Sequence, residues 1–384
     1  MKTTLTSRDR MSAAIRLEEP DHVPLWCLWS HARDPYNRKD DRKRVEALLD
    51  LGLDDTLWLY GPWRIHPDVK VTSWAEPVPD EEYDLIHKRF ETPAGTLEHI
   101  LRTSEHFTSA DDIPVMGDFN MSHGIRSLIR GREDLPALRY LLSDPDPQQL
   151  ADYREQAKAY RQFVQDKQVL LEGAFVPLGD AAAWLVQPQD LIYACQDDPG
   201  FVEELLDIIQ EWNLKQVGYL LDEKVDTLLH RGWYEFPDFW GVDGYRKFLK
   251  PRLQKEIDLV HQADVWFSYI MTKGIMPLLD DFLELGIDLL WGVDPVQGEA
   301  DLEAVARKVS GRMAVLGGFN GNLTVSEGPI ADIERDVETA IRTLGPGGGY
   351  IAAPVDKIEE WTPWEHVEAM IAKWKELAAY PIQV

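Results

Sequence analysis

Acidic, basic and cationic side chains stand at the ends of several short apolar runs of this sequence, where they could act on a bound ligand. His230 and Arg231 end one run and together offer an acid or base that titrates near neutral pH and a fixed positive charge. Tyr269 ends the next run and could donate a proton to a departing oxygen, while Asp294 is a carboxylate followed by a backbone-restricting proline. We predict His230, Tyr269 and Asp294 as catalytic residues, and a salt bridge to acidic neighbours is the structural alternative for the His230–Arg231 pair.

A wider set of polar and aromatic side chains is predicted to bind the substrate. Its members follow the apolar runs and are Trp29, His31, Arg33, Asp180, Arg231, Lys273, Asn320 and Asp356. Several have a plain structural alternative: His31 could be an ordinary loop histidine, Asp180 a helix N-cap, and Lys273 part of a solvated loop. Asn320 lies in a glycine-rich turn where a ligand could approach the backbone, but no lysine follows to complete a phosphate-binding loop.

Some of these residues could also bind a metal. His31, His230, Asp294 and Asp356 could supply nitrogen and oxygen ligands to a hard or borderline ion. Ligands from separate strands meet only in space, so their spacing in the sequence does not test this reading. The metal content therefore stays open at this point.

The apolar runs themselves have the character of buried strands. They are mostly continuous rather than alternating, as in parallel strands covered on both faces. Stretches with a helical period lie between them, for example 202–221 and 330–344. We therefore predict an α/β fold, a single (β/α)8 TIM barrel whose polar strand ends share one opening. The predicted strands are 23–29, 55–61, 169–175, 225–231, 264–270, 287–293, 312–318 and 348–354.

Residues 62–168 interrupt this alternation with a long, polar and poorly periodic stretch. We interpret them as an insertion that contains a small β element at 90–97 and helices, and that covers the barrel mouth as a lid or docking surface. We find no internal repeat and no interdomain linker, so the whole chain, 1–384, is predicted to be one domain.

The composition limits the classes of partner. The chain has 67 acidic against 40 basic residues and a formal net charge of −27. Such a surface repels phosphate backbones and anionic lipids, so we expect neither nucleic acid nor a membrane as partner. Two cysteines, Cys27 and Cys195, form no disulfide framework, and we see no export signal, so we expect a cytoplasmic protein.

Tryptophan is unusually frequent, with 14 residues in the chain. Trp26, Trp29, Trp58 and Trp63 crowd the first two predicted strands. They could pack in the core or form the walls of an aromatic-lined pocket, and we expect most of them in the core.

Segments in a fixed order give the sequence a resemblance to a known family. They are 8–24 (RDRM…EPDHVP), 92–97 (TPAGTL), 277–288 (PLLDDF…LGID), 347–351 (GGGYI) and 362–367 (TPWEHV). The ordered set spans nearly the whole chain and resembles the uroporphyrinogen decarboxylase superfamily, and 92–97 is similar to an element of its methyltransferase-like branch. The resemblance implies the TIM barrel and a pocket at the C-terminal ends of its strands.

The sequence also departs from two motifs of that superfamily. Uroporphyrinogen decarboxylases carry an arginine-rich loop after the first strand, whereas residues 29–33 (WSHAR) hold one arginine, too few for several carboxylates. The thiol-methylating branch has a His-x-Cys zinc motif after strand six and a cysteine after the last strand. The corresponding residues are 270–272 (IMT) and 354–356 (PVD), so the usual zinc ligands are absent, although zinc bound in another way stays open. We predict no tightly bound cofactor.

Three hypotheses follow for the function. The first is transfer of a methyl group from a small methylated compound, such as an aromatic methyl ether or a quaternary amine, to a corrinoid (cobalamin) on a partner protein. The second is decarboxylation of a carboxylated pyrrole or aromatic acid without a cofactor. The third is a barrel that binds ligands without catalysis, since fold alone does not assign function. The identity of the substrate is open, and so is a homodimer.

Overall fold

The central feature of the computed structural model, which describes residues 4–29, 41–104, 106–117, 124–175 and 178–383, is a seven-stranded parallel sheet curled into a half-barrel. The strand order is β1-β6-β7-β8-β9-β10-β11, and every pairing is parallel. Each strand coincides with a predicted run to within two residues at either end. The strands are β1 (Thr56–Tyr60), β6 (Leu170–Phe175), β7 (Thr227–Arg231), β8 (Trp266–Ile270), β9 (Leu289–Val293), β10 (Ala314–Asn320) and β11 (Tyr350–Val355).

The prediction of a regular strand at 23–29 is wrong. This segment makes isolated parallel bridges instead, from Leu25 to Ala352 of β11 and from Trp26 to Asp54, two residues before β1. Pro24 has no N–H and contributes its carbonyl alone, which accepts from Ala352 N at 2.9 Å. An extended but irregular segment therefore lies between the two edge strands of the sheet.

Apolar side chains of the sheet divide into two cores according to the alternation of the strands. Leu229 and Ile270 belong to an inner core with Met11 and Ile15 of α1 (Ser7–Ile15), so α1 closes the N-terminal end of the sheet's concave side. The neighbouring residues, such as Leu228, belong to the outer core that faces the helices. Successive residues of one strand therefore point into different environments.

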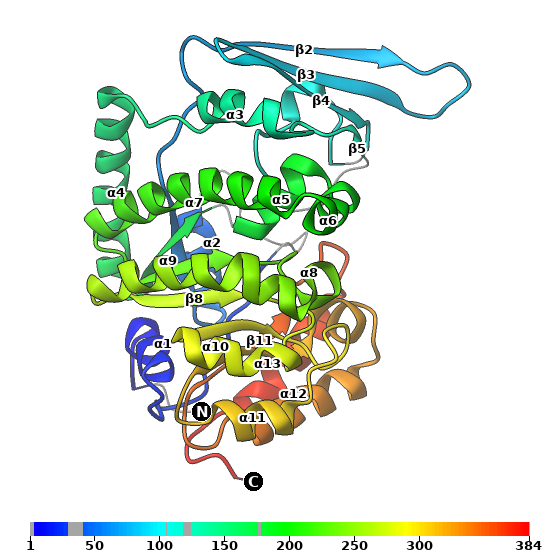
Figure 1. The fold of residues 1–384 in the computed structure, drawn as a ribbon. Helices are drawn as coiled ribbons and strands as arrows, with labels where there is room; N and C mark the ends of the chain where they lie inside the picture. Colours follow the sequence, from blue (N-terminus) through cyan, green and yellow to red (C-terminus); the bar gives the residue numbers. More distant parts are fainter. Residues whose placement is uncertain (1–3, 30–40, 105, 118–123, 176–177, 384) are drawn as a thin grey trace.

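Helices cover the outer face of the sheet. In Figure 1 α7, α9, α10 and α11 lie side by side across the front, and consecutive members of this row are in contact. The predicted helices 202–221 and 330–344 are confirmed as α7 and α12, and Asp198 caps α7 by accepting from Phe201 N at 3.1 Å. No helix among the described residues is long and apolar enough to span a bilayer. The other helices are α2 (Asp41–Asp50), α3 (Leu135–Leu141), α4 (Pro147–Lys167), α5 (Leu178–Val186), α6 (Pro188–Asp197), α7 (Pro199–Asp222), α8 (Pro237–Gly244), α9 (Lys250–Gln262), α10 (Leu279–Leu285), α11 (Leu302–Val309), α12 (Ile330–Leu344), α13 (Trp364–Leu377) and the π-helical turns η3 (Tyr245–Leu249) and η5 (Gly321–Ser326).

A separate antiparallel sheet occupies much of the stretch between β1 and β6. Its order is β2-β3-β4-β5, and it projects at the top of Figure 1. The β element predicted at 90–97 is confirmed as the turn of the β3–β4 hairpin. By contrast, α4 contacts both β1 and β6 and thus covers the parallel sheet. The strands are β2 (Lys70–Pro77), β3 (Asp84–Thr92), β4 (Gly95–Arg102) and β5 (Gly124–Arg126).

Candidate active site

A cavity of about 90 Å³ lies at the C-terminal ends of the parallel strands. That volume accommodates roughly six to nine water-sized atoms. Every lining residue lies outside 62–168, so no described residue of that stretch borders the cavity. The lining residues are Trp26, Leu28, Trp58, Leu229, Arg231, Trp233, Ile270, Thr272, Trp291, Gly292, Leu316, Pro354, Val355 and Asp356.

Four indoles form the walls of this cavity. The rings of Trp26 and Trp291 lie 4.5 Å apart between centroids and are tilted by 58°. Trp58 donates its Nε1–H to Glu172 at 2.8 Å, whereas Nε1 of Trp233 and Nε1 of Trp291 are buried without a hydrogen-bond partner among the described residues. Walls of this kind present flat π faces, which suit an aromatic ring or a methylated cation.

Two charged side chains, Arg231 and Asp356, are among the described residues that line the cavity. Asp356 is exposed, but the surrounding protein partly dehydrates its carboxylate and raises its pKa to about 6 against the attraction of Lys357. Repulsion from Glu359 and Asp294 adds to this rise. A carboxyl group of this kind holds its proton closer to neutral pH than an ordinary aspartate. The cavity therefore combines a cation with a candidate proton donor.

Glu172 of β6 is a buried carboxyl group next to the cavity residue Trp58, and the sequence analysis did not single it out. It accepts hydrogen bonds from Thr56 Oγ1 at 3.0 Å and Trp58 Nε1 at 2.8 Å, and burial raises its pKa to about 7. The available signal was an acidic residue in the middle of the apolar run VLLEGAF, which is costly unless partners are provided.

His230 and Tyr269, which were predicted at the shared opening, lie close together on the outer side of the sheet instead. Both are fully buried, and neither lines the cavity. His230 contacts Glu256 Oε2 through Nδ1 at 2.7 Å and Glu235 Oε1 through Nε2 at 3.1 Å, and Tyr269 donates to Glu235 Oε2 at 2.7 Å. Burial alone lowers the pKa of His230, yet the two carboxylates outweigh it and raise that pKa to about 10. The roles predicted for both residues have no direct route to a ligand in the cavity.

Asp294 and Asn320 form a second buried cluster beside the cavity. Asn320 Nδ2 donates to Asp294 Oδ2 at 2.8 Å, and Asp294 Oδ1 accepts from Val296 N at 2.8 Å. Asn320 Oδ1 accepts from Leu323 N at 2.6 Å and so caps η5. Burial raises the pKa of Asp294. These contacts fix the turns after β9 and β10, and neither side chain lines the cavity.

The remaining predicted binding residues are dispersed. Asp180 is buried at the start of α5 and accepts from Tyr234 N at 2.7 Å, and Lys273 pairs with Asp238 at 2.8 Å. Trp29 packs edge-on against Trp364, with ring centroids 6.0 Å apart. None of these three lines the cavity. His31 and Arg33 lie outside the described residues.

The described residues contain no group of three or more His, Cys, Asp and Glu side chains placed to hold a metal ion. Met271 and Thr272 follow β8, Val355 ends β11 and Asp356 follows it, so the residues at these strand ends do not fit a thiolate-activating zinc site. Of the four ligands considered for a metal, His230 has both ring nitrogens bonded to glutamates.

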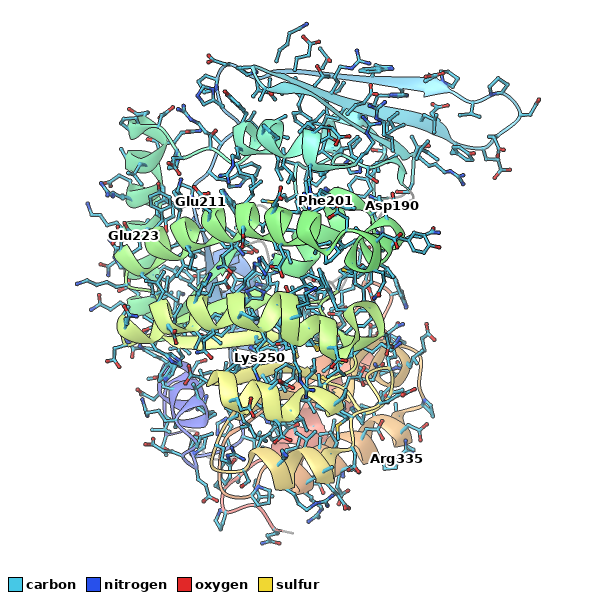
Figure 2. The ribbon with its side chains drawn as sticks, viewed as in Figure 1. Asp190, Phe201, Glu211, Glu223, Lys250 and Arg335 are labelled. Atoms are coloured by element: carbon cyan, nitrogen blue, oxygen red, sulfur yellow. The ribbon has the colours of Figure 1, made fainter. Side chains whose placement is uncertain are left out.

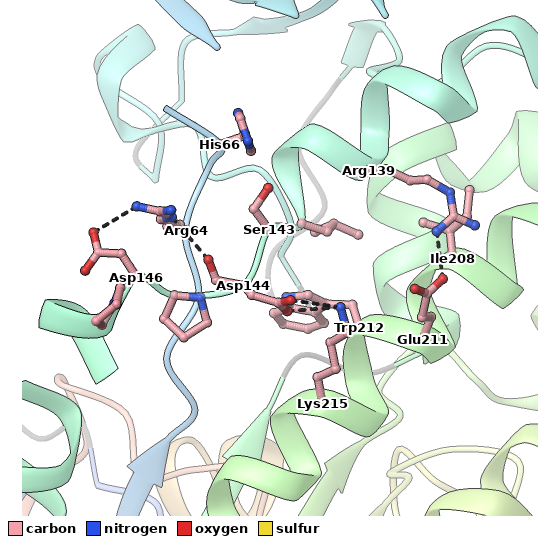
Figure 3. Close-up of a pocket in the computed structure, with 13 residues that line it drawn as sticks. Arg64, His66, Arg139, Ser143, Asp144, Asp146, Ile208, Glu211, Trp212 and Lys215 are labelled. Atoms are coloured by element: carbon pink, nitrogen blue, oxygen red, sulfur yellow. Dashed lines mark hydrogen bonds and ion pairs between the residues drawn. The ribbon is translucent and has the colours of Figure 1, made fainter. Parts of the chain in front are cut away.

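A larger cleft of about 460 Å³ lies on the outside of the molecule, between α7 and the turn after α3. Figure 3 shows its cations already paired: Arg64 with Asp146 at 2.8 Å, Arg139 with Glu211 at 2.7 Å, and Lys215 with Asp144 at 3.0 Å. A ligand would have to displace these pairs. We therefore take the tryptophan-lined cavity as the candidate active site.

Comparisons with known proteins agree with this fold. A methyltransferase from Methanosarcina mazei is similar in structure, with a TM-score of 0.60 and 18% identity over 97% of this chain and 99% of that one. A D-psicose 3-epimerase from Clostridium cellulolyticum H10 aligns with a TM-score of 0.36 and 9% identity over 58% of this chain and 81% of its own, which supports no functional argument. No curated protein matches significantly. The profile described as uroporphyrinogen decarboxylase (URO-D) matches residues 127–377, which is more than half of the chain, and the chain therefore belongs to the uroporphyrinogen decarboxylase family.

Proposed function

We propose that this protein is a methyltransferase that removes the methyl group from a small aromatic methyl ether and passes it to a corrinoid on a partner protein. The observation that carries the proposal is the cavity itself, with four indole walls, one cation and one carboxyl group of raised pKa at the strand ends. The fold shared with a methyltransferase agrees with it. We further propose that the irregular segment 24–29 completes an eight-stranded barrel around this cavity.

The residues of the cavity suit the demands of ether cleavage. The indoles of Trp26, Trp58 and Trp291 would bind the aromatic ring by stacking. When bound, the reduced corrinoid supplies the electron pair that accepts the methyl group. The ether oxygen keeps the electrons of the broken carbon–oxygen bond, and Asp356 would donate a proton to it, while Arg231 would stabilise the charge that develops.

An ether fits these residues better than a quaternary amine does. A quaternary amine leaves as a neutral tertiary amine and requires no acid, and its positive charge would be repelled by Arg231. A phenolate leaving group instead benefits from both a cation and a proton donor. The charged groups of the cavity therefore favour the ether.

Decarboxylation of a single aromatic acid is the second candidate. Arg231 could orient one carboxylate, and Asp356 could protonate the carbon that is left. A porphyrinogen with several carboxylates would require more cations than the described lining residues provide.

The deciding experiment incubates the pure protein with guaiacol and free cob(I)alamin under anoxic conditions. We expect catechol and methylcob(III)alamin to appear in equal amounts, measured by chromatography and absorbance, and to depend on the wild-type protein. Release of CO₂ from an aromatic acid in the absence of cobalamin would instead support decarboxylation. If no methyl ether is cleaved and no aromatic ligand shifts the melting temperature, the methyl-transfer proposal is wrong and a non-catalytic role gains support.

A further inference from the structure

Residues 231–235, the last residue of β7 and the segment after it, contribute two side chains to the wall of the cavity. Arg231 and Trp233 line the cavity, and Gly232 N donates to Ile270 O at 3.1 Å. The segment ends at Glu235, which is fully buried on the opposite, helix-facing side. Its conformation therefore decides where one indole and one guanidinium lie relative to a ligand.

Glu235 anchors this segment to three other elements. Its carboxylate accepts from His230 Nε2 of β7 at 3.1 Å, Tyr269 Oη of β8 at 2.7 Å and Gly179 N of α5 at 2.6 Å. The packing is tight, because a Cβ at Gly179 would lie 2.6 Å from Glu235 Cγ. Glu235 therefore cannot shift without breaking several buried contacts.

His230 carries the positive charge that makes this arrangement stable. An uncharged imidazole donates from one nitrogen alone, whereas both nitrogens of His230 face carboxylate oxygens. The second carboxylate, Glu256, already accepts from Gln210 at 3.0 Å and Asn213 at 3.2 Å through its other oxygen. The donors around both glutamates thus favour two carboxylates on either side of an imidazolium.

A second anchor lies between Trp233 and Glu235, at Tyr234. Asp180 Oδ1 accepts from Tyr234 N at 2.7 Å. The chain directly after Trp233 is thus held at two successive residues, by the backbone hydrogen bond of Tyr234 and by the carboxylate of Glu235. Both anchors come from residues buried outside the cavity.

We propose that Glu235 and His230 form a buried ion-pair clamp whose role is to position Trp233 and Arg231 in the cavity. Both are positioning residues, since they contact neither the cavity nor a ligand in it. The clamp does not depend on the proposed reaction, because it fixes the wall of the cavity for any ligand. Among the described residues, the ionisable groups that face the clamp are Glu256 of α9, Tyr269 of β8 and, next to Tyr269, Tyr245 of η3.

The position of Trp233 can be followed directly by ¹⁹F NMR of protein labelled with 5-fluorotryptophan, in which Trp233→Phe assigns its resonance. We expect Glu235→Gln to move or broaden this resonance by more than its linewidth, because the amide cannot accept from all three donors and removes the counter-charge of His230. The resonance of Trp74, which lies on β2 of the separate antiparallel sheet, should not change.

Glu223→Gln is the matched control. Like Glu235, Glu223 is a buried glutamate in an ion pair, and its partner is Arg161. Figure 2 shows Glu223 at the far end of α7 from Phe201 and Asp190. It should lower the melting temperature without moving the Trp233 resonance. An unchanged Trp233 resonance in folded Glu235→Gln would overturn the proposal.

If Glu235→Gln does not fold, Glu235→Asp keeps the charge but draws the carboxylate back from His230, Tyr269 and Gly179 by one methylene, and it should move the same resonance by a smaller amount. No movement there would equally overturn the proposal. The charge of His230 has its own readout in ¹⁵N-labelled wild-type protein. Both ring N–H protons should be observed, with no titration between about pH 6 and 8, and a titration in this range would contradict the charged clamp.

Discussion

At the level of single side chains, Asp356 is the residue that we propose as the proton donor in the cavity. Its carboxyl group borders the cavity, and its pKa is raised to about 6. His230, the acid–base residue predicted from the sequence, instead has both nitrogens bonded to carboxylates and a pKa raised to about 10, so it remains charged and buried at neutral pH. Proximity to the end of a strand was therefore a weaker guide than the direction in which the side chain points.

We predict that Asp356→Asn lowers kcat/KM for methyl-ether cleavage by roughly 10²- to 10⁴-fold, the usual contribution of a general acid. In the wild type the protonated carboxyl group is the active form, so kcat/KM should fall as the pH rises through about 6. The variant should lose this dependence. Initial rates measured across the pH range check both statements, and a wild-type rate that increases with pH through this region would exclude Asp356 as the acid.

Glu172 should make the folded protein less stable as the pH rises, whereas a carboxylate in a salt bridge makes it more stable. Burial raises its pKa from the ordinary 4.5 to about 7, so its favourable contribution is complete below pH 4.5 and is lost as the pH rises through about 7. Glu172→Gln stays neutral and can still accept from Trp58. At pH 8 the variant should be more stable than the wild type by up to about 3 kcal/mol, and the difference should vanish near pH 4.5. Urea unfolding at both pH values measures the difference. Equal stability at pH 8 would show that the surrounding hydrogen bonds offset the cost of burying the Glu172 carboxylate.

At the level of elements, β10 requires a glycine where it packs against α12 and β11. Gly318 has a φ of +103°, and a Cβ there would lie 2.4 Å from Tyr350 Oη and 2.8 Å from Ala340 Cβ. Both neighbours are themselves buried, so neither has room to move away.

We expect Gly318→Ala to destabilise the protein by about 3 kcal/mol, through backbone strain and overpacking together. Gly311→Ala is the control, because its φ of +66° is also positive but nothing lies within 4 Å of the added Cβ. It should cost about 1 kcal/mol. Thermal unfolding of the two variants checks this order, and equal losses would mean that β10 adapts to the added methyl group.

At the level of the whole molecule, Arg10 connects α1 to the region where the irregular segment 24–29 meets the start of β1. Its guanidinium contacts Asp21 at 2.8 Å and Asp54 at 2.6 Å, and it is almost fully buried. At Asp54, the effect of burial exceeds the attraction of Arg10 and raises the pKa of the carboxyl group to about 6. At Asp21, the hydrogen bonds from Arg10, Thr4 and Leu5 exceed the effect of burial and hold the pKa far below its usual value.

Arg10→Ala should therefore cost about 3–5 kcal/mol, because it leaves buried carboxylates without their partner. Arg16→Ala, which removes an exposed arginine paired with Glu18 just after the same helix, should change stability by less than about 0.5 kcal/mol. Urea unfolding at neutral pH compares the two variants. A small loss for Arg10→Ala would show that the ion pairs of Arg10 with Asp21 and Asp54 contribute little to stability.

The sequence by itself determined the parallel α/β architecture, since continuous apolar runs such as 287–293 and helical periods such as 330–344 are local patterns that burial enforces. The sequence could not determine toward which side of the sheet the side chains at each strand end point. His230 and Arg231 are adjacent in sequence, yet the alternation of β7 sends one into the helix layer and the other into the cavity. The tertiary structure also decided that Trp26 and Trp58 line the cavity while Trp63 packs against Trp212, because a site built from separate strand ends exists only once the strands are side by side.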